Sequence, residues 1–277
     1  MRTMDATNIY GGSTVYTEEQ CGGFLDALGA YITPSGGSQD ARSSAVIGIN
    51  IDAELDSTTC AMLSFFPGQD SSPKAFSNFT SLESSFSGNS VSSSFVEYTN
   101  LTNTPAFSAQ TSRWLFATAA LKVGEATIPL INRTFIETVR SRLHLLQNKT
   151  SVAIGLSVQP ITRSWLQAAR DAGGDAIDLD PADGPFIALV MNLDWENAED
   201  DLFINRLARD FVSNVNRASK REGLYFGFNY MNDAHRGQPI FEHYGSRRKS
   251  LPRLKQIQRQ YDRTGTLARY FNTGFPL

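Results

Sequence analysis

The sequence predicts an α+β fold in which a mostly antiparallel β-sheet carries helices packed on one face. Two observations lead to this prediction. Short apolar runs of strand-like composition recur along the chain, and longer amphipathic segments lie between them without regular alternation. The sequence also lacks the glycine-rich phosphate loop that a parallel nucleotide-binding sheet carries. With 277 residues, the chain is long enough to bury a sizeable core.

The N-terminal part of the chain predicts strands, a helix and a hairpin. Asn8–Thr17 places a glycine pair between β-forming residues, which is typical of a strand, a bend and a second strand. Glu18–Ile32 has apolar residues at helical spacing before Pro34, so it predicts a helix. Ser44–Ile51 and Cys60–Phe66 are apolar runs with polar flanks, and they predict an antiparallel hairpin of core strands.

The next part of the chain is less regular. Pro67–Ser94 is serine-rich with little periodicity, so we expect a long, mobile surface excursion. Phe95–Thr99 and Trp114–Lys122 predict strands. Pro129–Gln147 carries its apolar residues on one stripe and predicts a helix.

Ser151–Ile161 predicts a strand with one face of small and polar residues. Alternate residues of a strand point the same way. The residues on this face are Ala153, Gly155, Ser157 and Gln159. Two interpretations remain open: the small face leaves room for a ligand that Gln159 binds, or the glycine marks a weak edge strand.

The second half of the chain predicts three helices and a central strand, besides the aromatic-rich stretch described below. Arg163–Asp171 predicts a short helix, and Phe186–Trp195 predicts a central strand. Ala198–Lys220 begins with acidic residues and ends with basic ones, which suits the dipole of a long helix. Ser250–Tyr261 predicts a basic amphipathic helix.

Four aspartates crowd the segment between the first of these helices and the central strand. Their interval does not fit the calcium-binding loop, so we expect a turn in which carboxylates accept hydrogen bonds from nearby backbone. The four are Asp175, Asp178, Asp180 and Asp183.

Leu224–Gly245 concentrates the side chains that look reactive. Leu224–Met231 is aromatic-rich and predicts a strand. One face of that strand would carry Phe226, Phe228, Tyr230 and Asn232. This pattern indicates either a phenol and an amide that touch a bound molecule, or a core strand whose aromatic residues only pack.

Composition limits the classes of partner. The net charge is −3, so a polyanion such as nucleic acid is not expected. No apolar run is long enough to cross a bilayer, and a membrane partner is not expected either. The three histidines are too scattered for a zinc site, so no metal is predicted. Cys21 and Cys60 could form one disulfide or remain two buried thiols.

Asn-X-Ser/Thr glycosylation motifs are compatible with the secretory pathway, whereas the N-terminus lacks the apolar core of a signal peptide, so the sequence leaves the compartment open. The four motifs begin at Asn78, Asn100, Asn132 and Asn148.

Several short motifs resemble, in order and spacing, the C-terminal half of fungal FAD-linked oxidoreductases of the berberine bridge enzyme-like family. These flavoproteins share the vanillyl-alcohol oxidase type of architecture. The motifs are IYGG at Ile9–Gly12, GGDAIDLDPADGP at Gly173–Pro185, YMNDA at Tyr230–Ala234, Gln238, YG at Tyr244-Gly245, YD at Tyr261-Asp262 and NTGFPL at Asn272–Leu277.

The resemblance implies a domain order and a cofactor. Residues 1–245 resemble the substrate domain, whose antiparallel sheet lies over the flavin in this family. Residues 246–277 resemble the C-terminal helix and tail that dock on the FAD domain. The family binds FAD through an N-terminal domain that is absent from this sequence, so we expect the chain alone to bind none.

The resemblance also implies roles for individual residues. Tyr230 matches a family tyrosine at the substrate face of the flavin and is the candidate catalytic base. Asn232, beside it, is the candidate cofactor-binding residue. From the strand patterns, and not from the resemblance, Gln159 and Phe228 are the candidate substrate-binding residues. Asp233 departs from many members, which carry a second tyrosine there.

Three functions follow as expectations. The first is the substrate domain of an FAD-dependent oxidoreductase that oxidises or oxidatively cyclises a small secondary metabolite, with the FAD half supplied by a separate chain or lost. The second is a stand-alone, cofactor-independent cyclase or isomerase that uses the same pocket. The third is a non-catalytic binding remnant.

Overall fold

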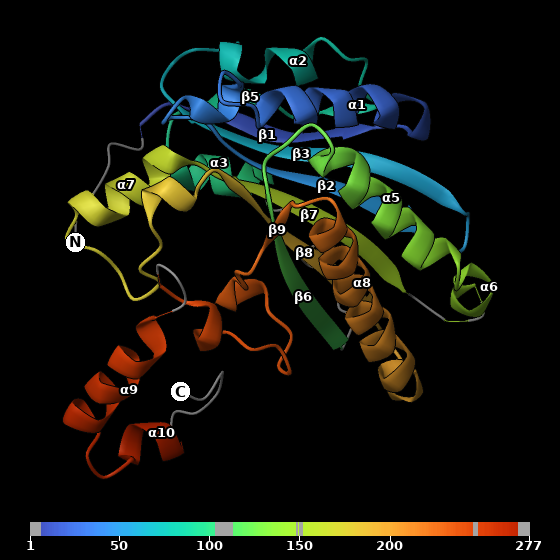
Figure 1. Ribbon diagram of the computed structural model, residues 1–277. Helices are drawn as coiled ribbons and strands as arrows, with labels where there is room; N and C mark the ends of the chain where they lie inside the picture. Colours follow the sequence, from blue (N-terminus) through green and yellow to red (C-terminus); the bar gives the residue numbers. More distant parts are fainter. Residues whose placement is uncertain (1–6, 103–112, 148, 150–151, 246–248, 271–277) are drawn as a thin grey trace.

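An antiparallel sheet forms the centre of the molecule (Figure 1). The computed structural model describes residues 7–102, 113–147, 149, 152–245 and 249–270. Within these residues the sheet has nine strands, in the order β4-β1-β3-β2-β7-β8-β6-β9, with β5 also paired to β1. The predicted α+β class is therefore confirmed.

The strands are β1 Ile9–Tyr16, β2 Ser44–Asp52, β3 Ser57–Pro67, β4 Phe86–Ser87, β5 Ser90–Ser92, β6 Arg113–Lys122, β7 Ala153–Ile161, β8 Phe186–Trp195 and β9 Tyr225–Phe226. The α-helices are α1 Glu18–Tyr31, α2 Ser77–Thr80, α3 Phe95–Thr102, α5 Thr127–Arg140, α6 Leu143–Leu146, α7 Arg163–Asp171, α8 Asp201–Arg221, α9 Ser250–Tyr261 and α10 Thr266–Tyr270.

One face of the sheet carries the main hydrophobic core. Alternate residues of β6, β7 and β8 point into it, as the period of two requires. Helices α1, α5 and α8 bury their apolar stripes on this face, and the rings of Phe135 and Phe211 pack with centroids 5.9 Å apart. A disulfide between Cys21 and Cys60 ties α1 to β3, with 5.6 Å between their Cα atoms. Of the two alternatives for Cys21 and Cys60, one disulfide or two buried thiols, the structure has the disulfide.

The opposite face of the sheet is only partly covered. We call it the open face. The side chains of Val46, Trp114 and Phe116 lie on it with 43%, 44% and 39% of their surface exposed. Between them lie small residues such as Gly48 and Gly155. Helix α7 and the segment 227–245 cover only part of this face.

Two predicted strands are wrong or shortened. Phe95–Thr99 belongs to helix α3, because Ser94 Oγ accepts a bond from Glu97 N–H while the Glu97 carboxylate accepts one from Ser93 N–H. This reciprocal capping outweighs the strand-like composition. Of Leu224–Met231, only Tyr225–Phe226 is a strand, and Met231–Asp233 forms a 3-10 turn.

Four other expectations are corrected. Asn8–Thr17 contains one continuous strand without a bend. The excursion Pro67–Ser94 is packed onto the sheet, because Phe76 and Phe79 are 0% exposed and β4 and β5 pair with β1. Strand β7 lies between β2 and β8, so it is not an edge strand. The predicted helix Pro129–Gln147 is divided into α5 and α6.

The remaining predicted elements are confirmed: the β2–β3 hairpin, α1, β6, α7, β8, α8 and α9. Asn78 and Asn100 are exposed, and Asn132 lies on α5. Asn148 and the NTGFPL tail lie outside the described residues. None of the described helices is both long and apolar enough to cross a bilayer.

Candidate functional site

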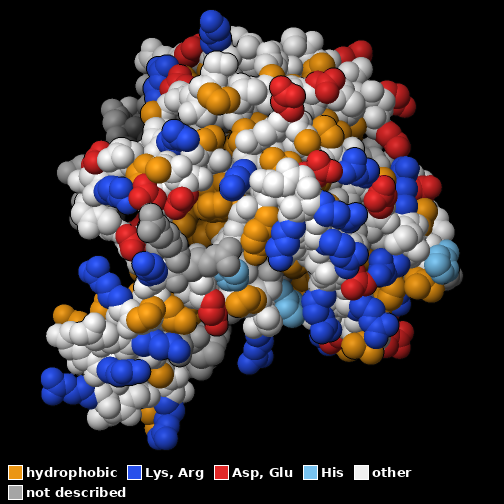
Figure 2. Space-filling view, in the orientation of Figure 1, with side chains coloured by type: hydrophobic (Ala, Val, Ile, Leu, Met, Phe, Trp, Pro, Cys, Tyr) orange, Lys and Arg blue, Asp and Glu red, His pale blue; other side chains and the backbone are white. Residues whose placement is uncertain are grey.

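A cavity of about 350 Å³ opens on the open face, where β7 ends and β8 begins. Its floor is formed by Gln159 and Ile161 of β7 with Phe186 and Ala188 of β8, because the strand register pairs Gln159 with Ala188. Figure 2 shows hydrophobic side chains gathered in a hollow beside α7.

Two further segments wall the cavity. Helix α7 contributes Trp165 and Leu166, and the loop that follows it contributes Ile177 and Leu179. Trp165 has 67% of its surface exposed, and no residue of α7 is buried. These walls were not predicted from the sequence, because the helix and the loop meet the strands only in three dimensions.

The aspartate-rich loop is held as a turn. Asp175 Oδ1 accepts bonds from the backbone N–H groups of Ile177 and Asp178, at 2.9 and 2.8 Å, and Asp180 Oδ1 accepts one from Ala182 N–H at 2.9 Å. These bonds confirm the turn prediction. No three potential metal-binding side chains gather in the part of the chain that the structure describes.

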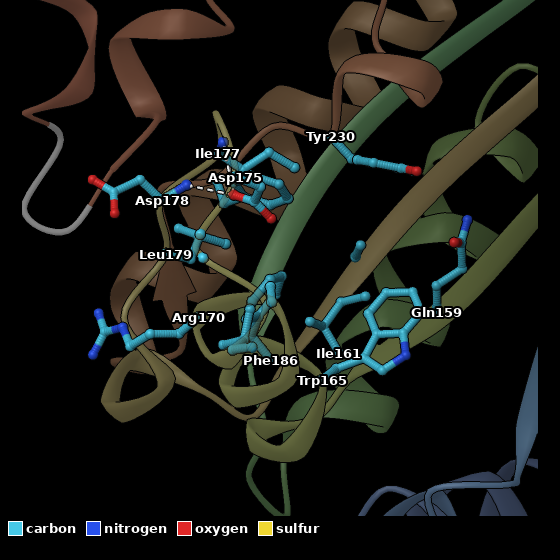
Figure 3. Close-up of a pocket in the computed structure, with 16 residues that line it drawn as sticks. Gln159, Ile161, Trp165, Arg170, Asp175, Ile177, Asp178, Leu179, Phe186 and Tyr230 are labelled. Carbon is cyan, nitrogen blue, oxygen red and sulfur yellow. Dashed lines mark hydrogen bonds between the residues drawn. The ribbon is translucent and has the colours of Figure 1, made fainter. Parts of the chain in front are cut away.

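Three of the four predicted site residues meet at this cavity. Gln159, Phe228 and Tyr230 all line it, and Figure 3 shows Gln159 and Tyr230. Phe228 is 4% exposed and packs edge-on against Phe186, with ring centroids 5.4 Å apart. It therefore belongs both to the cavity wall and to a small second hydrophobic cluster. Phe228 thus packs as the core-strand interpretation expects, and its contact with a ligand stays a prediction.

Asn232 does not line the cavity. Its side chain is exposed, and its Nδ2 donates a hydrogen bond of 2.9 Å to the hydroxyl oxygen of Tyr230. The phenol and the amide therefore lie side by side as expected, although the 3-10 turn at Met231–Asp233 brings them together and not a strand pleat.

Asp233 is a polar residue beside the cavity lining that was not assigned to the site from the sequence; Arg170, Asp175 and Asp178, which line the cavity, were not assigned to it either. Its Oδ2 accepts a hydrogen bond of 3.0 Å from Gln159 Nε2. Burial raises the pKa of the Asp233 carboxyl, and the bond from Gln159 partly opposes this shift. Since the two residues are 74 positions apart, only the fold reveals the contact.

The segment that carries Tyr230 is anchored to the edge of β6. The Gln238 side chain accepts a bond from Thr118 N–H at 2.9 Å and donates one to Thr118 O at 2.8 Å. It thus replaces the partner that a neighbouring strand would supply. The same Gln238 oxygen accepts from His235 N–H, so the turn after Asp233 is fixed as well.

The described residues fit the ring system of a flavin better than the pyrophosphate of FAD. The open face exposes apolar side chains and carries small residues such as Gly48, which suits the face of an aromatic ring system. A glycine-rich loop at a helix N-terminus, which would hold a pyrophosphate, is not found among the residues that the structure describes.

Comparisons with known proteins agree with this picture. No family model matches the chain. The FAD-dependent monooxygenase prx3 of Penicillium roqueforti is 28% identical over 265 residues, which cover 95% of this chain and 51% of that protein. The chain spans about half the length of the curated relatives that it matches.

Solved flavoprotein structures share the fold. In 6-hydroxy-D-nicotine oxidase from Arthrobacter nicotinovorans, the match has a TM-score of 0.61 at 15% identity and covers 94% of this chain and 53% of that one. In the berberine bridge enzyme-like protein 1 of Physcomitrella patens, the TM-score is 0.54 at 10% identity, with 93% and 52% covered.

The fold is thus that of FAD-dependent flavoprotein oxidoreductases. The curated relatives include FAD-dependent monooxygenases, and a berberine bridge enzyme-like protein is among the solved structures that share the fold, which agrees with the resemblance of the motifs.

Proposed function

We propose that this chain is the substrate-binding part of an FAD-dependent oxidoreductase that oxidises a small, largely apolar metabolite. The observation that carries the proposal is an apolar cavity with a polar end, formed by Tyr230 and Gln159, which opens on an incompletely covered sheet face. Such a cavity is a typical small-molecule site. The other half of the protein would hold the FAD against the open face.

Tyr230 is the residue proposed to move a proton. Its hydroxyl oxygen already accepts a hydrogen bond from Asn232, and such a donor supports negative charge on that oxygen during proton transfer. When bound, the flavin supplies the hydride acceptor of the oxidation. Phe228 and the other apolar walls position the substrate and exclude water.

The C-terminal arm supports the proposed division at residues 245 and 246. Figure 1 shows α9 and α10 extending away from the sheet. Their exposed side chains include Ile257, Tyr261, Leu267 and Tyr270. An arm with this much apolar surface suits docking on a second domain, and we propose that residues 246–277 dock on the FAD-binding part.

The visible absorption of the protein purified from its own source tests the cofactor. We expect flavin bands. A folded but colourless native protein that still changes the metabolite profile of its host would contradict the proposal and favour a cofactor-independent cyclase.

A strain that carries Tyr230→Phe tests the catalytic residue. We expect its oxidised product to fall about 100-fold, because a positioned base contributes about that factor or more. Tyr225→Phe is the matched control, since Tyr225 lies on β9 outside the cavity and should leave the product unchanged. Equal product levels in the two strains would remove Tyr230 from the mechanism.

A further inference from the structure

One hydrogen bond fixes the orientation of the polar group at the cavity floor. An ionised carboxylate can only accept hydrogen bonds, so Asp233 must face the NH₂ group of Gln159 and not its oxygen. The carbonyl oxygen of that amide then points away from Asp233. Gln159 lines the cavity, and Figure 3 shows its amide and the Tyr230 hydroxyl at the same end of it.

Asp233 is held in place by the turn in which it lies. Its backbone N–H donates to Tyr230 O at 3.1 Å within the 3-10 turn, which Gln238 anchors to β6. Among the ion pairs of the described residues, none involves Asp233. A neutral amide, Gln159, is therefore the partner that the structure gives to this half-buried charge.

We propose that Asp233 is a positioning residue that locks the Gln159 amide with its oxygen toward the cavity, so that the site selects an apolar ligand carrying a hydroxyl or N–H donor. A ligand whose donor is capped by a methyl group leaves that oxygen without a partner and is discriminated against. The inference rests on the proposed function in that the cavity is taken as the substrate site, and it names the substrate class.

The test uses two probes of the same apolar body, 2-naphthol and 2-methoxynaphthalene, titrated into the purified full chain by calorimetry. We expect wild type to bind the naphthol about tenfold more tightly, which is the effect of one hydrogen bond of about 1.4 kcal/mol. Asp233→Asn should reduce this preference to about twofold or less, since an asparagine can either donate or accept and so leaves the Gln159 amide free to turn over. Gln159→Leu should abolish the preference.

A second glutamine–aspartate pair provides the matched control. On α7, Gln167 Nε2 donates to Asp171 Oδ1 at 2.7 Å, and neither residue lines the cavity. Asp171→Asn makes the same chemical change outside the site and should leave the tenfold preference intact. Thermal melts of all the variants show whether they fold.

Three results would overturn the proposal. They are equal binding of the two probes by wild type, full preference retained by a folded Asp233→Asn variant, and no binding of either probe to the folded chain. The probes need no flavin, so this outcome is independent of the absorption spectrum. A colourless native protein with a clear donor preference would refute the proposed function and keep the role of Asp233.

Discussion

At the scale of single residues, Gly11 in β1 has no room for a side chain. A Cβ at this position would lie 2.0 Å from Ser64 O and 2.9 Å from the Tyr98 ring. Ser64 O is fixed because it accepts a 2.8 Å bond from the Tyr98 hydroxyl. Gly11→Ala should therefore lower the free energy of unfolding by about 1–3 kcal/mol, the usual effect of overpacking.

Gly29 is the matched control for this substitution. It lies in α1, and nothing stands within 4 Å of its added Cβ. Gly29→Ala should raise the free energy of unfolding by about 0.5–1 kcal/mol, because alanine loses less backbone entropy in a helix. Urea denaturation measures both variants, and equal effects would show that the close approach at Gly11 is relaxed in solution.

His235 should make stability depend on pH. Gly237 N–H donates to its Nδ1 at 3.1 Å, so the neutral ring must donate from Nε2 to Asn205 Oδ1, at 2.9 Å. Burial, and then the charge of Arg209, lower the pKa of His235. The unfolded chain consequently binds the proton more readily than the folded chain.

The sign of the effect follows from that difference. The free energy of unfolding should rise with pH up to about 6.5, the ordinary histidine value, and the contribution of His235 should be complete above it. Urea melts between about pH 5 and pH 8 measure the slope. His235→Gln should flatten it, and an unchanged slope in this variant would place the titrating group elsewhere.

The sequence identified single site residues better than their partners. Tyr230, Phe228 and Gln159 were predicted because aromatic composition and strand alternation are local properties. Asp233 was noted only as a departure from the family pattern, because its bond to Gln159 depends on how the 3-10 turn lies over β7.

At the scale of elements, the segment 227–245 depends on one side chain for its place on the sheet. Gln238 forms both bonds to the Thr118 backbone and one to His235 N–H. Gln238→Leu leaves the buried Thr118 groups without this partner, so we expect a loss of about 2–3 kcal/mol. Hydrogen exchange should show the Thr118 amide opening, together with the turn that carries Tyr230.

Gln256→Leu is the control for this change, since Gln256 is exposed on α9. It should leave the exchange of the Thr118 amide unchanged. Protection of that amide in Gln238→Leu equal to wild type would mean that water or another group replaces the clamp.

Strongly periodic elements were predicted well, and elements set by local capping or by edge contacts were not. Strand β8 follows from its continuous apolar run, and helix α8 follows from its apolar stripe and the charges at its two ends. Helix α3 was missed because its first turn is decided by Ser93, Ser94 and Glu97 and not by the β-favouring residues that follow. Strand β9 is short because Gln238, and not another backbone, occupies the edge of β6 beyond it.

At the scale of the whole molecule, the two faces of the sheet differ in what covers them. The face under α1, α5 and α8 is a closed core, whereas the open face exposes Val46, Trp114 and Phe116 to solvent. The sequence predicted helices on one face, but it could not say which positions of the other face stay uncovered, because that depends on strand register across the sheet.

The open face should make the chain associate with itself when it is expressed alone. Apolar surface that water contacts is stabilised by contact with a second surface, and burying about 55 Å² is worth about 1.4 kcal/mol, or tenfold in a dissociation constant. The triple variant Val46→Ser, Trp114→Ser, Phe116→Ser should therefore weaken self-association at least about tenfold in sedimentation velocity, and it should bind less of a hydrophobic dye.

Leu55 and Leu202 are 74% and 68% exposed away from the open face, so replacing both with serine controls for exposed leucine in general. If the control double variant weakens association as much as the triple variant, the contact is not made by the open face. The proposed docking of an FAD-binding half on this face would then lose its physical basis.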